Sequence, residues 1–156
     1  MRVLLGCFLS VLLTGCASFN SYTEPKTGSQ PLATVSGSSY RNGLFDWNTN
    51  MVTSVDDKQI GMVWSEDSKI NVIPGSHSFV ISSQFNRGFG TGPYSSITEL
   101  RATLKPGTSY RFTSKPQGAS LKVWAEDDHG QRISNIASSN YQYAPPVPTF
   151  TTVIVN

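Results

Sequence analysis

The chain has 156 residues, with 12 basic and 10 acidic side chains and a net charge of +2. The basic residues are scattered and form no run, which argues against nucleic-acid binding because that function needs a concentrated basic surface. Serine, threonine, glycine, aromatic and β-branched residues are abundant after the first residues, whereas alanine, leucine and glutamate are sparse. This composition is typical of β proteins.

The beginning of the chain has the pattern of a targeting segment. Arg2 is followed by an apolar, uncharged run from Val3 to Leu13. The run is far shorter than the ~20 residues that a membrane-spanning helix needs, but it fits the apolar core of a signal peptide. We therefore predict that residues 1–15 are a signal peptide, removed by cleavage before Cys16.

The apolar run ends in Leu13-Thr14-Gly15-Cys16, which resembles the lipobox of bacterial lipoproteins. In that family the cysteine thiol accepts a diacylglycerol. The resemblance therefore implies lipidation of Cys16 and attachment to a membrane, since two or three acyl chains hold a soluble domain stably. The next residue is Ala17, not the aspartate that retains such lipoproteins at the inner membrane. The resemblance thus favours the outer membrane with the domain in the periplasm, and surface exposure stays open.

Two further regions follow the predicted signal peptide. Residues 16–31 are polar and show no apolar periodicity, so we expect a lipidated, flexible tether. Residues 32–156 are expected to form a single domain of ordinary size. Because Cys7 leaves with the signal peptide and Cys16 takes the lipid, this domain has neither a disulfide nor thiol chemistry.

Short runs of alternating apolar residues recur between turn signals from Leu32 onward. They predict an all-β fold, a small antiparallel β-sandwich or barrel of about eight short strands. The alternation is clearest at Leu121, Val123 and Ala125, expected in the core, with Trp124 half covered on the other face. The candidate strands cover residues 32–36, 51–55, 60–64, 69–73, 77–83, 97–104, 109–114, 120–126, 131–136 and 150–155.

Two hairpin signatures resemble PEGA-type domains and related small β-sandwich lipoproteins. The first combines a V-D-G-K-like turn at Val55–Lys58 with residues 70–81, which contain a P-G-x-H sequence; the second is Leu104–Phe112. Asp57 stands where glycine is usual in this family. The resemblance implies an envelope-associated, non-enzymatic module, transfers no active site, and gives His77 a structural role as a hydrogen-bond donor that closes its turn.

No residue pattern favours catalysis or a cofactor. Residues 126–130 combine three carboxylates with His129, but they lie between two predicted strands and lack the alternate-residue spacing of a calcium loop. A solvated turn explains them better than a metal site. His77 and His129 are the only histidines, and no G-x-S-x-G or H-E-x-x-H motif is present. We therefore predict no catalytic residue, no metal and no cofactor.

The segment 84–95 is rich in glycine and aromatic residues and is expected to be a loop. It places aromatic rings and a guanidinium on flexible backbone, and these residue types are enriched at binding hot spots. A second aromatic cluster surrounds Trp47, where packing is the other interpretation. The candidate binding residues are Phe85, Arg87, Phe89, Tyr94 and Trp47.

These patterns favour a non-catalytic binding or structural module that contacts another envelope protein. The alternative is a carbohydrate-binding module for peptidoglycan or a surface glycan, in which Trp47, Trp64 or Trp124 would stack on sugar rings. A hydrolase would require Asp, Glu and His residues that are distant in sequence to converge in a cleft. The identity of the partner, the pathway and the oligomeric state do not follow from the sequence.

Overall fold

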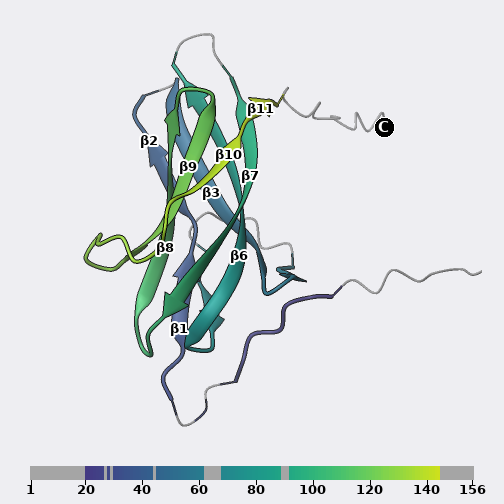
Figure 1. Cartoon of the computed structure of the whole chain (residues 1–156), viewed down its shortest axis with the longest axis vertical. Helices are drawn as coiled ribbons and strands as arrows, with labels where there is room; N and C mark the ends of the chain where they lie inside the picture. Colours follow the sequence, from purple (N-terminus) through teal and green to yellow (C-terminus); the bar gives the residue numbers. More distant parts are fainter. Residues whose placement is uncertain are drawn as a thin grey trace, which may run out of the picture.

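The computed structural model describes residues 20–26, 28, 30–43, 45–61, 68–88 and 92–144. Within these residues the regular elements are eleven β-strands, which form two facing sheets (Figure 1). The predicted all-β fold is therefore confirmed, as a sandwich. No helix in the described part of the chain is both long and apolar enough to span a membrane.

One sheet has the strand order β10-β9-β8-β1-β5, and the other has the order β11-β7-β6-β3-β2 with the short β4 paired to β3. Neighbouring strands are antiparallel except for the parallel pair of β1 and β8. The strands are β1 (Ala33–Ser36), β2 (Ser38–Arg41), β3 (Asp46–Val55), β4 (Lys58–Gln59), β5 (Ile70–Val72), β6 (Gly75–Arg87), β7 (Tyr94–Leu104), β8 (Ser109–Gln117), β9 (Ser120–Asp127), β10 (Ala137–Asn140) and β11 (Gln142–Tyr143).

The hydrophobic core lies between the sheets because alternate residues of the long strands point inward. On β9 the side chains of Leu121, Val123 and Ala125 are fully buried. Trp124 is half-buried on the outer face, so the predicted alternation of this strand is confirmed. Residues from both sheets meet in the centre, and the core gains its largest fully buried side chains from phenylalanines at positions 79, 85 and 112.

Two segments pass directly from one sheet to the other. β1 and β2 are separated only by Gly37, and β10 and β11 are separated only by Tyr141, yet each pair is divided between the two sheets. At the second crossing the hydroxyl of Ser139 on β10 contacts the hydroxyls of Ser96 and Thr98 on β7. Hydroxyl contacts therefore link the two sheets at this edge.

The strands around the predicted loop 84–95 are longer than expected. β6 continues to Arg87 and β7 begins at Tyr94, so only residues 88–93 connect them. The prediction was wrong because pairing of β6 with β3 and β7 continues past the apolar alternation. At the end of β6 the polar Gln84 is exposed and Asn86 is partly covered, while Phe85 between them points into the core.

Two other strand predictions were wrong. Residues 131–136 do not form a strand: Arg132 makes one isolated bridge to Glu126, and β10 instead lies between residues 137 and 149, where no strand was predicted. The serine-rich sequence of β10 carries no apolar signal. The strand is held instead by main-chain pairing with β9. The predicted strand 60–64 is misplaced at its start: a two-residue turn at Asp56 and Asp57 leads directly into β4 at Lys58–Gln59, and residues 60–61 lie outside the strand. Residues 62–64 and the predicted strand 150–155 lie outside the described residues.

Candidate functional site

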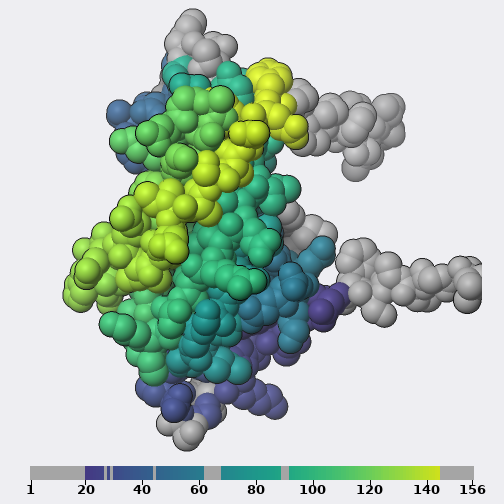
Figure 2. All heavy atoms as spheres, in the orientation of Figure 1, coloured from purple at the N-terminus to yellow at the C-terminus, as the bar shows by residue number. Residues whose placement is uncertain are grey.

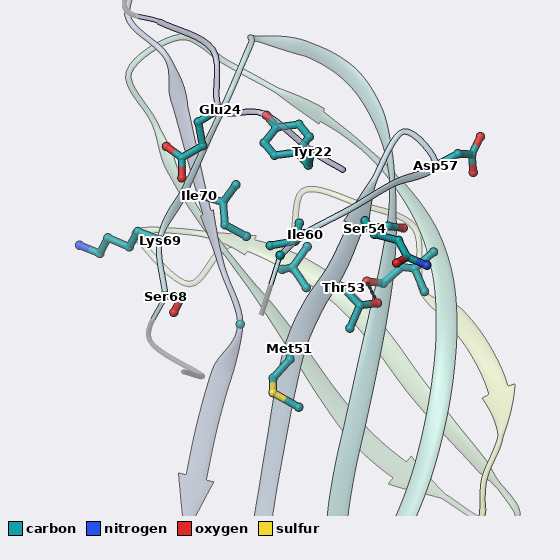
Figure 3. Close-up of a pocket in the computed structure, with 15 residues that line it drawn as sticks. Tyr22, Glu24, Met51, Thr53, Ser54, Asp57, Ile60, Ser68, Lys69 and Ile70 are labelled. Atoms are coloured by element: carbon teal, nitrogen blue, oxygen red, sulfur yellow. Dashed lines mark hydrogen bonds between the residues drawn. The ribbon is translucent and has the colours of Figure 1, made fainter. Parts of the chain in front are cut away.

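A hollow of about 1120 Å³ lies at the edge of the sandwich beside β3, β4 and β5 (Figure 3). We call it the edge groove. Apolar side chains in its lining alternate with polar and charged ones, a combination typical of binding sites. Its apolar residues are Met51, Val52, Ile60, Ile70 and Val80, and its polar residues include Tyr22, Glu24, Thr53, Ser54, Asp57, Gln59, Ser68 and Lys69.

Residues 20–24 form one wall of the edge groove. Ser21 makes a parallel bridge to Gln59, the N–H of Tyr22 donates to the carbonyl of Gln59 at 2.6 Å, and the N–H of Gln59 donates to the carbonyl of Asn20 at 2.8 Å. This segment therefore lies along β4 like a short extra strand. These residues fall in the stretch predicted to be a flexible tether, and their backbone groups pair with a strand edge whatever the polarity of their side chains.

Tyr22 fixes the position of this wall. Its hydroxyl donates to the carbonyl of Asn71 on β5 at 2.7 Å, and the side-chain amide of Asn71 donates to the carboxylate of Glu24 at 2.8 Å. Burial raises the pKa of Tyr22, and the negative charges of Glu24 and Asp56 raise it further. The phenol therefore keeps its proton and remains a donor, which ties residues 20–24 to both β4 and β5.

The floor of the edge groove includes an irregular part of β3. The pairing of β3 with β6 shifts register between Val52 and Ser54, which leaves Thr53 in a bulge. On the other side of β3, β2 pairs as far as Asn50 and β4 begins to pair at Ser54. Among the described residues, no strand pairs with the short edge of β3 between Asn50 and Ser54. The carbonyl of Thr53 on this edge accepts a hydrogen bond from the N–H of Ile60 at 3.0 Å.

The arrangement of side chains in the edge groove suits an elongated ligand. Figure 3 shows Tyr22, Ile60 and Ile70 around the hollow, whereas Lys69 and Asp57 point outward on opposite sides. Glu24 lies on the same side as Lys69. An apolar centre with charged residues on both sides can hold apolar side chains while the charged residues select groups of complementary charge. None of the described residues that line the groove is a histidine or cysteine, and the described residues contain no group of three or more His, Cys, Asp or Glu arranged to hold a metal ion.

His77 joins the turn beside the edge groove to the start of β6. Its Nε2 lies 2.7 Å from the carbonyl of Ile73, which can only accept, so Nε2 donates and the predicted turn-closing role is confirmed. Its Nδ1 lies 2.6 Å from one carboxylate oxygen of Asp56, whose other oxygen accepts from the N–H of Ser78 at 3.0 Å. Partial burial raises the pKa of Asp56, but these two hydrogen bonds, with the charges of His77 and Lys58, outweigh it and lower the pKa below 3.8.

The residues predicted to form a contact loop serve mainly in packing. Phe85 is fully buried, with ring centroids 5.7 Å from Tyr94 and 5.0 Å from Tyr141. Arg87 is exposed, but its guanidinium donates to the hydroxyl of Tyr141 and to the carbonyl of Gly118 at 3.3 Å. The expectation of exposed aromatics on mobile backbone is therefore wrong for Phe85. Phe89 lies outside the described residues.

The structure nevertheless brings three of the predicted binding residues together. Trp47, Phe85 and Arg87 line a smaller hollow of about 570 Å³, together with Tyr40 and Lys115. Trp47 is half-buried and belongs to β3, in the sheet opposite that of β9.

The other tryptophans do not add to this hollow. Trp124 lies on the outer face of β9, so it and Trp47 sit on opposite sides of the sandwich and cannot stack on one sugar chain. Trp64 lies outside the described residues. The acidic turn at residues 126–130 lies at the other end of the β8–β9 pair, where the Asp127 carboxylate accepts from the N–H groups of His129 at 3.0 Å and Gln131 at 2.8 Å.

Sequence reasoning missed the residues of the edge groove. Tyr22 and Glu24 lie in the stretch predicted to be a tether, where an aromatic residue among polar ones was the available signal. Met51 and Ile70 have the pattern of ordinary strand residues, and nothing in the sequence shows that a strand edge near them lacks a partner.

Comparisons of the chain with models of protein families, with curated proteins and with solved structures find no match.

Proposed function

We propose that this protein is a lipid-anchored envelope lipoprotein that binds another envelope protein in the edge groove and turns over no substrate. The observation that supports this most is the composition of the groove, an apolar floor with charged residues at its ends. One wall is formed by residues 20–24, close in sequence to the proposed lipidation site at Cys16. The proposed anchor therefore holds the groove near the membrane, within reach of membrane proteins.

An extended protein segment fits this groove better than a compact ligand. The short edge of β3 between its pairing with β2 and with β4 offers main-chain groups to an incoming strand. Ile60 and Ile70 can receive apolar side chains, and Lys69 and Asp57 would select opposite charges on either side. Main-chain hydrogen bonds would supply affinity and the side-chain contacts specificity.

A glycan-binding function is the second candidate, and the smaller hollow supports it. Trp47 and Tyr40 provide aromatic surface there, and Arg87 and Lys115 provide donors for sugar hydroxyls. Because Trp124 is on the opposite face of the sandwich, this hollow would have to bind the sugar alone.

Site-specific photocrosslinking in intact envelopes separates the two functions. A photoreactive residue is placed at Met51 in the edge groove, at Trp47 in the smaller hollow, or at Arg111 on the exposed outer face of β8 as a control. We expect one discrete protein adduct from Met51, none from Arg111, and loss of the Met51 adduct when Cys16→Ala removes the anchor.

The absence of an adduct at Met51 in the lipidated protein would contradict protein binding in the groove. Co-sedimentation with purified sacculi that Trp47→Ala abolishes and Met51→Ala leaves intact would instead support glycan binding in the smaller hollow.

A further inference from the structure

β7 presents a long strand edge that the described part of the chain leaves without a strand partner. β6 pairs with β7 along its whole length on one side. On the other side β11 pairs only with Tyr94 and Ser95, and β10 pairs with β9 in the opposite sheet. The edge from Ile97 to Thr103 therefore has no strand beside it among the described residues, although β10 passes obliquely over the beginning of β7 (Figures 1 and 2).

This edge lacks three of the features by which natural β proteins protect their exposed strands, namely a short length, a proline and a bulge. β7 is eleven residues long, contains no proline and shows no register shift against β6. Ile97 has 71% of its surface exposed. Long, regular edges of this kind pair readily with another strand, unless a bulge, a proline or a covering segment prevents it.

We propose that the β7 edge binds the β7 edge of a second copy of this chain, in antiparallel orientation about a two-fold axis at Leu100. Residues 97–103 of one copy then lie opposite residues 103–97 of the other. The centre of the free edge is the centre of the pairing, so every unpaired position from Ile97 to Thr103 gains a partner. The two sheets that contain β7 become one continuous sheet across a closed, symmetric interface.

The charges on the outer face of β7 favour this register. Leu100, Ala102 and Leu104 point into the core, whereas Ile97, Glu99 and Arg101 point outward. Residues directly opposite each other in an antiparallel pair lie on the same face. With the axis at Leu100, Glu99 of each copy lies opposite Arg101 of the other, which gives two pairs of opposite charge.

The neighbouring symmetric registers bring like charges together. An axis at Glu99 places the two copies of Glu99 opposite each other, and an axis at Arg101 does the same with the two arginines. Opposite charges at such positions stabilise a strand pair and like charges destabilise it. The sequence of β7 therefore supports self-pairing in one register, and this pairing requires neither the edge groove nor the proposed function.

Charge reversal in the full chain tests the proposal by sedimentation velocity over a concentration series. We expect a dimer for the unaltered chain and about tenfold weaker dimerisation for Glu99→Arg, because each of two attractive pairs becomes repulsive. The double variant Glu99→Arg/Arg101→Glu restores opposite charges and should dimerise within about twofold of the unaltered chain. Arg111→Glu on the outer face of β8 is the matched control and should have no effect. Circular dichroism establishes that each variant is folded.

Three outcomes would overturn the proposal. The unaltered chain could remain monomeric up to its solubility limit, or dimerise equally well with Glu99→Arg. In the third, a monomeric chain would dimerise only after residues 145–156 are deleted, which would assign the β7 edge to the chain's own C-terminal segment.

Discussion

At the residue scale, the turn between β3 and β4 has an unusual composition for its backbone conformation. Asp56 and Asp57 have φ angles of +48° and +61°, both in the left-handed region. A two-residue hairpin turn of this type is usually formed by Asn-Gly or Asp-Gly, because glycine has no Cβ to clash there. Asp56 is retained in this turn by its hydrogen bonds to His77 and Ser78, whereas no hydrogen bond of this kind joins Asp57 to another described residue.

Replacing Asp57 with glycine should stabilise the fold. We expect Asp57→Gly to raise the free energy of unfolding by about 0.5–1 kcal/mol, since it removes the cost of a left-handed conformation in a residue with a Cβ. Urea denaturation measures the change.

Gly118 provides the converse test. Its φ is +60°, and no neighbouring atom lies within 4 Å of the position that a Cβ would take. Gly118→Ala should therefore lower the free energy of unfolding by about 1 kcal/mol through backbone strain alone. Equal stabilities of all three proteins would contradict the role of strain.

The contact between Asp56 and His77 predicts a dependence of stability on acid. The pKa of Asp56 is lower in the folded protein than its ordinary value of 3.8, so the carboxylate stabilises the fold above that pH and loses this effect as the pH falls through the folded pKa. We expect Asp56→Asn, which keeps a residue tolerant of positive φ, to lose less stability between pH 5 and pH 3 than the unaltered chain. Because Asp56 is about half exposed, the difference should not exceed ~1 kcal/mol.

Parallel urea denaturation series at the two pH values measure this difference. His77→Gln serves as the second variant, since it removes the partner and leaves the carboxylate in place. Identical losses of stability in the unaltered chain and in Asp56→Asn would rule out a contribution from this pair.

At the scale of the elements, the ends of β6 and β7 form an aromatic cluster with the crossing between β10 and β11. Tyr141 lies at this crossing, with its ring 5.2 Å from Tyr94 and 5.0 Å from Phe85. Its hydroxyl donates to the carbonyl of Gly118 at 2.7 Å, so it also contacts the turn between β8 and β9. The cluster thus ties both sheets together at one end of the sandwich.

Removal of the central ring should destabilise the whole domain. We expect Phe85→Ala to lower the free energy of unfolding by about 3–5 kcal/mol, because it leaves a cavity among the rings of Tyr94 and Tyr141. Tyr143→Ala is the matched control: Tyr143 is 59% exposed at the margin of the same cluster, and its loss should cost about 0.5 kcal/mol or less. Urea denaturation of both variants tests this. Similar small losses would restore the interpretation of Phe85 as a surface contact residue.

The strand pattern shows how far the elements could be predicted. The strands at 33–36, 109–117 and 120–127 lie close to their predicted positions because apolar residues alternate cleanly there. β10 could not be found in this way, since its four residues Ala-Ser-Ser-Asn carry no apolar alternation and are held by main-chain bonds to β9 and by hydroxyl contacts to β7. Pairing partners, rather than local sequence, decide such strands.

At the scale of the whole molecule, the docked residues 20–24 limit the distance between the domain and the proposed membrane anchor. Three residues separate Cys16 from Asn20, so a fully extended chain spans at most about 14 Å between their Cα atoms. A flexible tether that continued to residue 31 would allow a much larger separation. The proposed lipidated protein therefore holds its β4 edge close to the membrane surface.

Fluorescence quenching by a lipid headgroup probe can detect this orientation. We expect a label at Lys58 on β4 to be quenched more strongly than one at Lys115 on β8. Lys58 pairs with Val55 of β3, whereas Lys115 follows Ser114, which is hydrogen-bonded to Asn48 of β3. Asn48 and Val55 are about 24 Å apart along the strand. Tyr22→Ala should reduce the difference, because it removes the hydroxyl that ties the wall of the groove to β5. Equal quenching of the two labels in the unaltered lipidated chain would exclude a docked wall.

The sequence by itself determined the all-β fold and the inward faces of the regular strands. These follow from local periodicity and turn chemistry, which act between neighbours in the chain. Only the tertiary structure decided that residues 20–24 form a wall of the edge groove, that Phe85 is buried, and that no other described strand pairs with β7 beyond Ser95 on the side away from β6. Each of these depends on which distant strand supplies hydrogen bonds and apolar contacts, and main-chain pairing carries no residue-specific signal by which one sequence can reveal it.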